Sequence, residues 1–332
     1  MAGNEKSKLK TLKVIEILNK YSDENHPMSA ADICAELAKE DIHAERKSIY
    51  SDIDVLRLYG YDIISTSTPK KGVYMGERDF ELVEVRLLID AVQSAKFITE
   101  KKTEVLVDKI ENNLSKWQIE DLSGQVYVDN RNKNENETVY YTIDTLSTAI
   151  RSEKKVSIHY IKRRIEAGER PKNEEHIYTV SPYALIWSDD HYYLVCNNEK
   201  YDNLMHLRID KIKHLEKTSL PARHFSEVSD YKNYFDSADY ASKLFNMYSG
   251  EPKPVEFICK NDTLEPMLDR FGENVKIQKY DDEHFVLRTN VASSEGLVAW
   301  IVQFGGRVKV KSPNDLIYSV KQKAAEILEI YD

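Results

Sequence analysis

Hydrophobic positions near the start of the chain recur first with the period of helices and then with that of strands. Three helices are expected, the second capped by Ser29 and the third running from about Glu45 to Gly60. Two short apolar runs then flank Pro69 to Gly72, a composition typical of a hairpin turn. The apolar residues that recur at helical spacing are Leu9, Leu12, Ile15, Leu18, Ile33, Leu37, Ile49, Ile53 and Leu56. We interpret residues 1–77 as a winged helix-turn-helix.

Residues 78–138 show a second helical pattern and predict a linker or dimerisation region. Asp79 is expected to cap one helix, and Thr99 a second that presents Leu106, Ile110, Leu114 and Trp117. Between Phe80 and Phe97 apolar residues cover almost every side, and such a helix requires burial on more than one side. We therefore expect self-association here. The polar run at 129–137 is interpreted as a linker.

The rest of the chain changes to strand periodicity. A helix near 143–150 and four strand-like runs predict a small antiparallel β-barrel of the Sm or SH3-like type at 139–216, with a long charged loop at 163–175. Residues 217–252 are expected to be a connecting segment. Residues 253–332 alternate as βαββαβ followed by a helix, which predicts a ferredoxin-like domain. The fold class is thus multidomain α+β.

Composition narrows the functional classes. The 332 residues carry a formal net charge of −9, which disfavours a protein that coats nucleic acid indiscriminately. The first 75 residues are nearly balanced in charge, so the excess of acid lies in the remainder. The polar N-terminus and the absence of a long apolar run predict a cytoplasmic protein. Three widely spaced cysteines predict neither a disulfide framework nor a zinc site.

The third predicted helix offers a surface for DNA. With Ile49 as the inward direction, Lys47, Ser48 and Ser51 lie on the far side, where helix-turn-helix proteins contact base edges. We expect phosphate contacts from the flank and from the hairpin tip, which supply Arg46, Tyr50, Lys70 and Lys71. The alternative is a solvated helix face without a ligand.

The barrel strands carry a second candidate surface. Alternation in LMHLRIDKI places His206 and Arg208 on one face, about 7 Å apart at roughly 3.3 Å per residue, a spacing suited to a phosphodiester or a carboxylate. Ser157 and His159 share a face in the same way. Rings on which a base can stack are Tyr183, Trp187, Tyr192 and Tyr193. The alternative is that these aromatics belong to the core and that Arg208 pairs with a nearby acid.

Motifs for catalysis are absent from the sequence. It contains no HExxH, no GxSxG, no Gly-rich nucleotide loop and no P-loop, and its nine histidines are scattered. We therefore predict no enzyme activity, no cofactor and no metal.

Three segments resemble WYL-domain transcriptional regulators. Residues 46–53 are similar to the recognition helix of these proteins. Tyr192-Tyr193-Leu194 and residues 208–212 resemble the WYL core. Gly296-Leu297, Trp300, Phe304-Gly305 and Pro313 are similar to their C-terminal extension domain.

The resemblance implies a bacterial transcription factor, usually a homodimer, whose Sm-like WYL barrel senses a ligand. In some members that ligand is single-stranded nucleic acid or a nucleotide, and the resemblance adds Lys211 to the ligand-binding residues. The sequence departs from the family at four positions: Tyr192 replaces the name-giving Trp, Ser51 and Lys211 each replace a common Arg, and Met205 replaces an Arg of some relatives.

Two hypotheses of different classes follow. The first is a homodimeric, ligand-responsive transcriptional regulator that binds a double-stranded DNA operator and senses a nucleic-acid-derived or other anionic ligand. The second is an RNA- or single-strand-binding accessory protein of a defence system, in which the N-terminal helices mainly dimerise. Lys70 and Lys71 at the hairpin tip favour the first, because an accessory protein does not require them.

Overall fold

The computed structural model describes residues 2–123, 133–134, 136–165, 170–188, 190–245, 247–248 and 250–331. The contacts divide the chain into two compact units, residues 1–135 and 136–332. Helices and antiparallel sheets are both present, as expected for a multidomain α+β protein. Most of the polar linker predicted at 129–137 lies outside the described residues.

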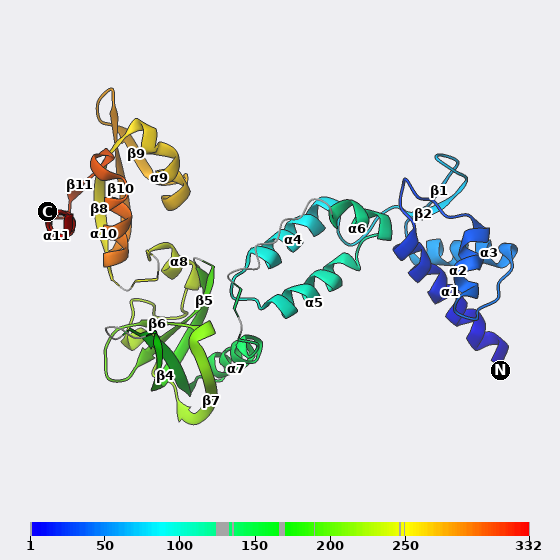
Figure 1. Cartoon of the computed structure of the whole chain (residues 1–332), viewed down its shortest axis with the longest axis horizontal. Helices are drawn as coiled ribbons and strands as arrows, with labels where there is room; N and C mark the ends of the chain where they lie inside the picture. The colour runs from blue at the N-terminus through cyan, green and yellow to red at the C-terminus, as the bar shows by residue number, and fades with distance from the viewer. Residues whose placement is uncertain are drawn as a thin grey trace. The chain divides into compact units, whose positions relative to one another are not determined.

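The first unit begins with three helices and a hairpin, in the predicted order (Figure 1). These elements are α1 (Ala2–Tyr21), α2 (Ala30–Ala38), α3 (Arg46–Tyr59), β1 (Ile63–Thr66) and β2 (Gly72–Met75). Ser29 caps α2 and exchanges hydrogen bonds with Asp32, and Gly60 ends α3 at φ +119°, as predicted. A side chain at Gly72 would collide with the backbone of Met28, which pairs with Val73, so the hairpin packs tightly onto the start of α2.

Three further helices follow: α4 (Leu82–Ser94), α5 (Glu100–Glu111) and α6 (Lys116–Ser123). Thr99 caps α5 as predicted, whereas α4 starts two residues later than predicted, at a capping box formed by Glu81 and Glu84 in place of Asp79. The predicted helix that reached Trp117 is also wrong in length. It is two helices, because the chain turns at 112–115 and buries Leu114 and Ser115.

A buried polar contact attaches these helices to the first three. The Asp23 carboxylate accepts hydrogen bonds from the Ser115 hydroxyl and pairs with His26, whose ring stacks on Trp117 at 4.5 Å. Arg78 donates to the carbonyl oxygens of Ser22 and Asn113. Burial raises the pKa of Asp23, but these hydrogen bonds outweigh it and hold the pKa below its usual value. The two parts of this unit therefore share a specific, charged contact.

Among the described residues of this unit, α4 packs through one side. Val85 and Ile89 are buried against α5 and α6, whereas Val83 is 65% and Leu87 63% exposed. Apolar residues therefore lie on more than one side of this helix, as expected, and the described residues leave Val83 and Leu87 mostly exposed.

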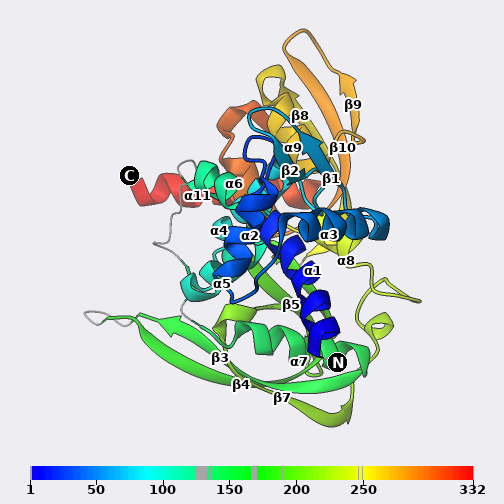
Figure 2. The same ribbon diagram turned by 90° about the vertical axis from the view of Figure 1, so that its right-hand side faces the viewer.

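The second unit begins with a helix and a five-stranded antiparallel sheet in the order β6-β5-β4-β3-β7. The elements are α7 (Val139–Arg151), β3 (Lys154–Arg164), β4 (Lys172–Ser188), β5 (His191–Asn198), β6 (Met205–Arg208), the 3-10 helix η2 (Ile209–Lys211) and β7 (Ile212–Pro221). Figure 2 shows β3, β4 and β7 side by side in one curved sheet, and α7 packs on these three strands.

Two sequence expectations for this sheet are wrong. The strand expected to continue through Asp210 ends at Arg208, where η2 turns the chain into β7. The long charged loop expected at 163–175 is mostly paired, because β3 and β4 form a hairpin with Arg164 opposite Lys172; residues 166–169 lie outside the described part of the chain.

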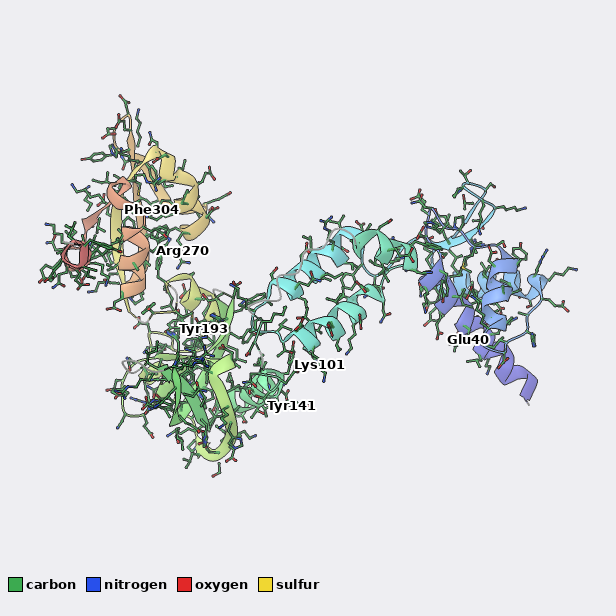
Figure 3. The ribbon with its side chains drawn as sticks, viewed as in Figure 1. Glu40, Lys101, Tyr141, Tyr193, Arg270 and Phe304 are labelled. Carbon is green, nitrogen blue, oxygen red and sulfur yellow. The ribbon has the colours of Figure 1, made fainter. Side chains whose placement is uncertain are left out.

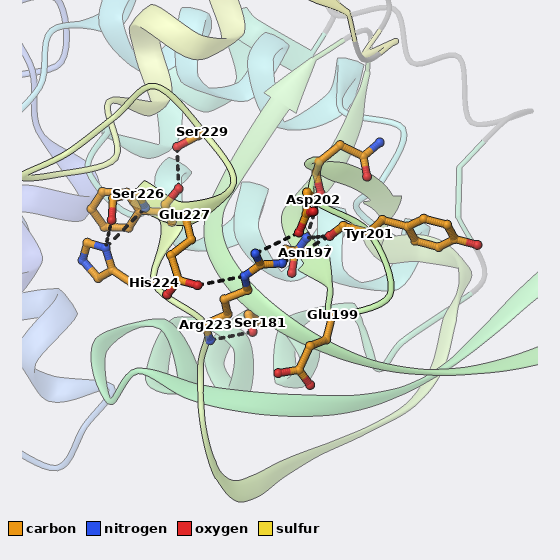
Figure 4. A network of polar contacts seen from close by, with 12 residues as sticks. Ser181, Asn197, Glu199, Tyr201, Asp202, Arg223, His224, Ser226, Glu227 and Ser229 are labelled. Carbon is orange, nitrogen blue, oxygen red and sulfur yellow. Dashed lines mark hydrogen bonds and ion pairs between the residues drawn. The ribbon is translucent and has the colours of Figure 1, made fainter.

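The connecting segment folds back onto the sheet through aromatic contacts. It contains the 3-10 helix η3 (Phe225–Glu227) and α8 (Ser237–Ser242). Its side chains form one buried cluster with Tyr183, Ile186 and Val195 of the sheet. Arg223 anchors the start of this segment by pairing with Asp202 and Glu227, and Figure 4 shows this network.

The last part of the chain has the predicted order of elements, βαββαβ and a helix. They are β8 (Glu251–Lys260), η4 (Asn261–Thr263), α9 (Leu264–Phe271), β9 (Lys276–Lys279), β10 (His284–Ser293), α10 (Glu295–Val302), η5 (Gly305–Arg307), β11 (Val308–Ser312) and α11 (Asn314–Tyr331). The strands pair in the antiparallel order β11-β8-β10-β9. Ser294 caps α10. Arg270, seen on α9 in Figure 3, donates to the carbonyl oxygen of Leu244 in the connecting segment.

Among the described residues, no helix is both long and apolar enough to cross a membrane. The same residues contain no group of three or more His, Cys, Asp or Glu side chains placed to hold a metal ion. The three cysteines are unpaired, and Cys196 and Cys259 are buried.

Candidate functional site

The outer face of α3 is the first candidate site. Ile49, Ile53 and Leu56 hold the helix against the core, and the buried Asp52 carboxylate receives Lys10 at 2.8 Å and Thr11 at 2.7 Å. This leaves the opposite side open to solvent. The residues exposed there are Arg46, Lys47, Tyr50 and Ser51. The structure therefore presents four of the five predicted α3 contacts together.

Ser48 differs from the other predicted contacts. Its hydroxyl donates to the carbonyl oxygen of Glu45 and accepts a hydrogen bond from Lys10, both at 2.9 Å. The side chain is half-buried in these contacts. Ser48 therefore serves the start of α3, and a base contact would require it to give up a hydrogen bond.

A groove of about 560 Å³ separates α3 from the hairpin. Tyr50 lines one side, Ser65 and Lys71 line the other, and the start of α2 closes the end. Lys71 has no partner among the described residues, whereas Lys70 forms a 2.9 Å ion pair with Asp32. The two predicted hairpin lysines are thus not equivalent, because Lys70 is neutralised by an acid that the sequence analysis did not consider.

Arg57 is a further residue that the sequence analysis did not assign. Its guanidinium donates to the carbonyl oxygen of Ile63 and to the Ser65 hydroxyl, both at 2.8 Å. These bonds attach the end of α3 to β1 and so set the angle between the helix and the hairpin. The sequence signal for this role was the position of Arg57 in the last turn of α3, one turn before the terminating Gly60.

The second candidate site is on the sheet, around Arg208. Arg208 lies directly across from Tyr193 on the neighbouring strand, and its guanidinium binds both oxygens of Asp210, at 3.0 and 2.6 Å. Its backbone N–H donates to the Tyr160 hydroxyl. The pair with Asp210, foreseen as the alternative to ligand binding, is therefore present, although the Arg208 side chain remains 28% exposed.

Cations gather beside this pair. Burial lowers the pKa of Lys211, and the nearby charges of Arg208, Arg163 and Lys162 lower it further, while Asp210 acts in the opposite direction. Lys162 and Arg163 were not among the predicted site residues. The basic residues at the end of β3 were the sequence signal for this cluster, but the sequence analysis assigned the run from residue 163 onward to a loop. We refer to Lys162, Arg163, Arg208 and Lys211 as the cationic cluster.

His206 is not part of an open ligand face. Its Nε2 lies 2.9 Å from the Tyr240 hydroxyl of α8, so the connecting segment covers it. Burial lowers the pKa of the His206 imidazole to about 4, although a hydrogen bond to the backbone of Met247 raises it. At neutral pH His206 is therefore uncharged, and Arg208 is the cation of this pair of residues.

The remaining predicted ligand residues separate into different environments. Tyr183 is 9% exposed in the aromatic cluster and donates to the carbonyl oxygen of Arg223, so it is a core residue. Tyr192 pairs across the strands with Trp187. Tyr193 is half-buried, and Figure 3 labels it on the barrel near α8.

His159 belongs to another group of contacts. It binds Glu175 at 2.7 Å and packs edge-on against His214, 5.4 Å between ring centroids. Arg208 binds Asp210 instead. The single polar face expected to contain His159, His206 and Arg208 is therefore not formed, because the curved sheet and the connecting segment direct these side chains into three different environments.

The comparisons with known proteins identify two domains. A WYL domain model matches residues 141–217, and a WCX domain model matches residues 260–328. The first range contains α7 and the sheet with the cationic cluster, and the second contains most of the C-terminal sheet and its helices. Comparison with curated proteins finds no match.

Among solved structures, the chain is similar to proteasome accessory factor B/C (PafBC) of Arthrobacter aurescens, with 14% sequence identity and a TM-score of 0.27. The likeness covers 98% of this chain and 49% of that chain, so this chain spans about half the length of PafBC. It is also similar to a CRISPR Cas-related protein, with 13% identity, a TM-score of 0.26, and coverage of 98% and 84% of the two chains.

The buried His206 predicts a pH dependence of stability. Its pKa is about 4 in the folded chain against 6.5 when unperturbed, so between these values the unfolded chain binds the proton and folding is disfavoured as the pH falls. From pH 7 to pH 5 this group should remove about 2 kcal/mol from the free energy of unfolding. Urea unfolding of His206→Gln should show a smaller loss than the wild type. His43→Gln, at an exposed position, should lose as much free energy of unfolding as the wild type. Equal losses in all three proteins would contradict the assignment of this pH dependence to His206.

Proposed function

We propose that this WYL- and WCX-domain protein is a homodimeric transcriptional regulator that binds duplex DNA through its N-terminal unit and responds to an anionic ligand bound by its WYL domain. The observation that carries the proposal is the exposed face of α3 beside a groove that ends at Lys71. We assign the N-terminal elements to the winged helix-turn-helix class, the WYL sheet to Sm or SH3-like barrels and the C-terminal sheet to the ferredoxin-like class. We place the protein in the cytoplasm.

The geometry of α3 supports the DNA-binding role. In helix-turn-helix proteins the second helix of the motif enters the major groove, and its exposed residues contact base edges. Lys47 and Ser51 occupy that position here, because they lie opposite the buried Ile49 and Ile53. Tyr50 and Lys71 line the groove, and Arg46 is exposed at the start of α3, so these three side chains are placed to contact phosphates. Base contacts supply specificity, and phosphate contacts set the register.

The cationic cluster supports the effector role. Asp210 pairs with Arg208, and the lowered pKa of Lys211 reflects burial together with repulsion from Arg208, Arg163 and Lys162. A bound anion would relieve that repulsion, and the guanidinium of Arg208 has further donors beyond those that bind Asp210. Tyr193, across the strand from Arg208, offers a ring beside the charge. These features favour a nucleotide or a short single strand.

The open face of α4 supports the homodimer. Val83 and Leu87 lie one turn apart on the side away from the buried Val85 and Ile89, and both are mostly exposed. A second copy of the same face would cover them through a two-fold contact. A dimer also doubles the number of bases read, which a single winged helix cannot do.

The second function in contention is binding of RNA or single strands without a duplex operator. It predicts that the α3 face and Lys71 are dispensable for nucleic-acid binding, which makes it an outcome of the first experiment below. We propose a binding role in preference to a catalytic one. The strongly shifted pKa values at Tyr160, Tyr183, Cys196 and His206 have burial as their largest cause.

The DNA-binding proposal is tested with two lysine variants after selection of bound duplexes from a random pool. Lys47→Ala should cost about 1–3 kcal/mol on the selected site and little on other sequences, because it removes a base contact. Lys71→Ala should weaken all sequences alike and lower the salt slope by about one. Lys39→Ala, at the other end of α2 from the groove, is the matched control. Equal effects of the first two variants, or no duplex binding at about 50 mM salt, would contradict the proposal.

Dimerisation is tested at the open face of α4. Leu87→Glu places a charge on a side chain that is 63% exposed in the single chain, so folding should persist while association weakens. Light scattering at micromolar concentration should give a dimer for the wild type and a monomer for this variant. Leu220→Glu, the same change at an exposed leucine of β7, should remain dimeric. A monomeric wild type would remove the proposal.

The effector site is tested with Lys211→Ala, which removes a cation without breaking the Arg208–Asp210 pair. Binding of a fluorescent single-stranded oligonucleotide should weaken about tenfold, or ~1.4 kcal/mol, while the melting temperature stays unchanged or rises. Arg208→Ala should lose binding and also lower stability by about 1 kcal/mol, because it leaves Asp210 half-buried and unpaired. Unchanged oligonucleotide binding in both variants, with Lys213→Ala as control, would overturn the assignment.

A further inference from the structure

The connecting segment does not close completely over the WYL sheet. Between its residues 228–244, the turn at 202–204 and the start of β8 lies a cavity of about 520 Å³. Both the WYL domain and the segment leading into the C-terminal sheet contribute to its walls. Its volume is within the range of pockets that bind small molecules.

The walls of this cavity are mainly apolar and aromatic. Leu204, Val228 and Leu244 are buried behind it, and the rings of Tyr231 and Tyr240 stand at 78° to each other with centroids 6.3 Å apart. The hydroxyl groups of both rings are already used. Tyr231 donates to Asp239, and Tyr240 bonds to His206. The Lys243 ammonium lies 5.8 Å from the centroid of the Tyr231 ring. The two rings therefore offer apolar surface to the cavity, and their hydroxyl groups bond to the surrounding structure.

The charges at the rim are not balanced. Asp202 pairs with Arg223, and Lys243 pairs with Asp239, so these two rim charges are neutralised by residues of the chain. Asp230 lines the same cavity and has no ion-pair or hydrogen-bond partner among the described residues. One exposed carboxylate thus remains beside two electron-rich rings. Both features attract a cation.

We propose that this cavity binds a small aromatic amine, with its ring packed against the rings of Tyr231 and Tyr240 and its ammonium group directed to Asp230. The site is separate from the cationic cluster in composition and opposite to it in charge preference, so it does not rest on the proposed anion response. Because Lys243 accepts a backbone hydrogen bond from Ala292 of β10, a ligand here contacts a segment that is bonded directly to the C-terminal sheet.

The experiment uses three probes that share one ring and differ in charge: tyramine, p-cresol and 4-hydroxyphenylacetate. Calorimetric titration of the full chain should give saturable binding in the order tyramine, p-cresol, 4-hydroxyphenylacetate, with about tenfold between the first and the second. Asp230→Asn should remove the preference for tyramine and leave p-cresol binding unchanged. Asp230 is exposed, so this variant is expected to fold.

A second pair of variants locates the binding. Asn203→Trp fills the mouth of the cavity and should weaken all three probes, whereas Lys200→Trp, on the same turn but outside the lining, should not. The proposal is overturned if none of the probes binds saturably, if 4-hydroxyphenylacetate binds best, or if the two tryptophan variants behave alike. If Asn203→Trp misfolds, the Asp230→Asn variant still tests the charge preference of the cavity, so the proposal can still be contradicted.

Discussion

The WYL sheet depends on the short turn that carries the chain from its first edge strand, β6, to its last, β7. Ile209 and Ile212 are fully buried at either end of η2, and the backbone N–H of Arg208 donates to Tyr160 of β3. Burial of two isoleucines at a place where a straight strand would expose one of them forces the chain to turn. The turn brings η2 into contact with both β3 and β5. Arg208, Asp210 and Lys211 acquire their positions from this turn.

Two surfaces of this acidic protein carry concentrations of positive side chains. The net charge of −9 would repel nucleic acid at long range, yet the cationic cluster and the outer face of α3 each concentrate positive side chains. Some of these cations form ion pairs with Asp or Glu side chains of the chain itself, and others do not. Asp32 neutralises Lys70 and Asp210 holds Arg208, whereas Lys71 and Lys47 remain solvent-exposed. Solvent and salt screen each exposed ion pair, so its contribution to the free energy of unfolding is small. Such ion pairs therefore affect the placement of the side chains more than the stability of the fold.

The connecting segment has more than a spacer role. Its aromatic residues complete a core that the WYL sheet lacks on that side, and they bury His206 in its neutral form. The same residues leave a cavity whose rim keeps one free carboxylate. One face of the sheet is thereby divided into a part that the connecting segment covers and a part around Arg208 and Tyr193 that remains partly exposed.

Local patterns were sufficient for most elements. The first three helices, the caps at Ser29 and Thr99, the stop at Gly60 and the βαββαβ order all follow from periodicity and capping chemistry that act within a few residues. The α3 face was predictable for the same reason, since one buried side of a helix defines its exposed side.

The errors arose where distant residues meet. The residues near Tyr183 and His206 in the sequence do not predict that the aromatic connecting segment buries these side chains. The residues near Lys70 do not predict its ion pair with Asp32. Alternation along a strand assigns residues to a face, but the curvature of the sheet and the packing of other segments decide which residues of that face stay in water. Burial and ion pairing are properties of contacts between distant parts of the chain, and only the folded chain brings those parts together.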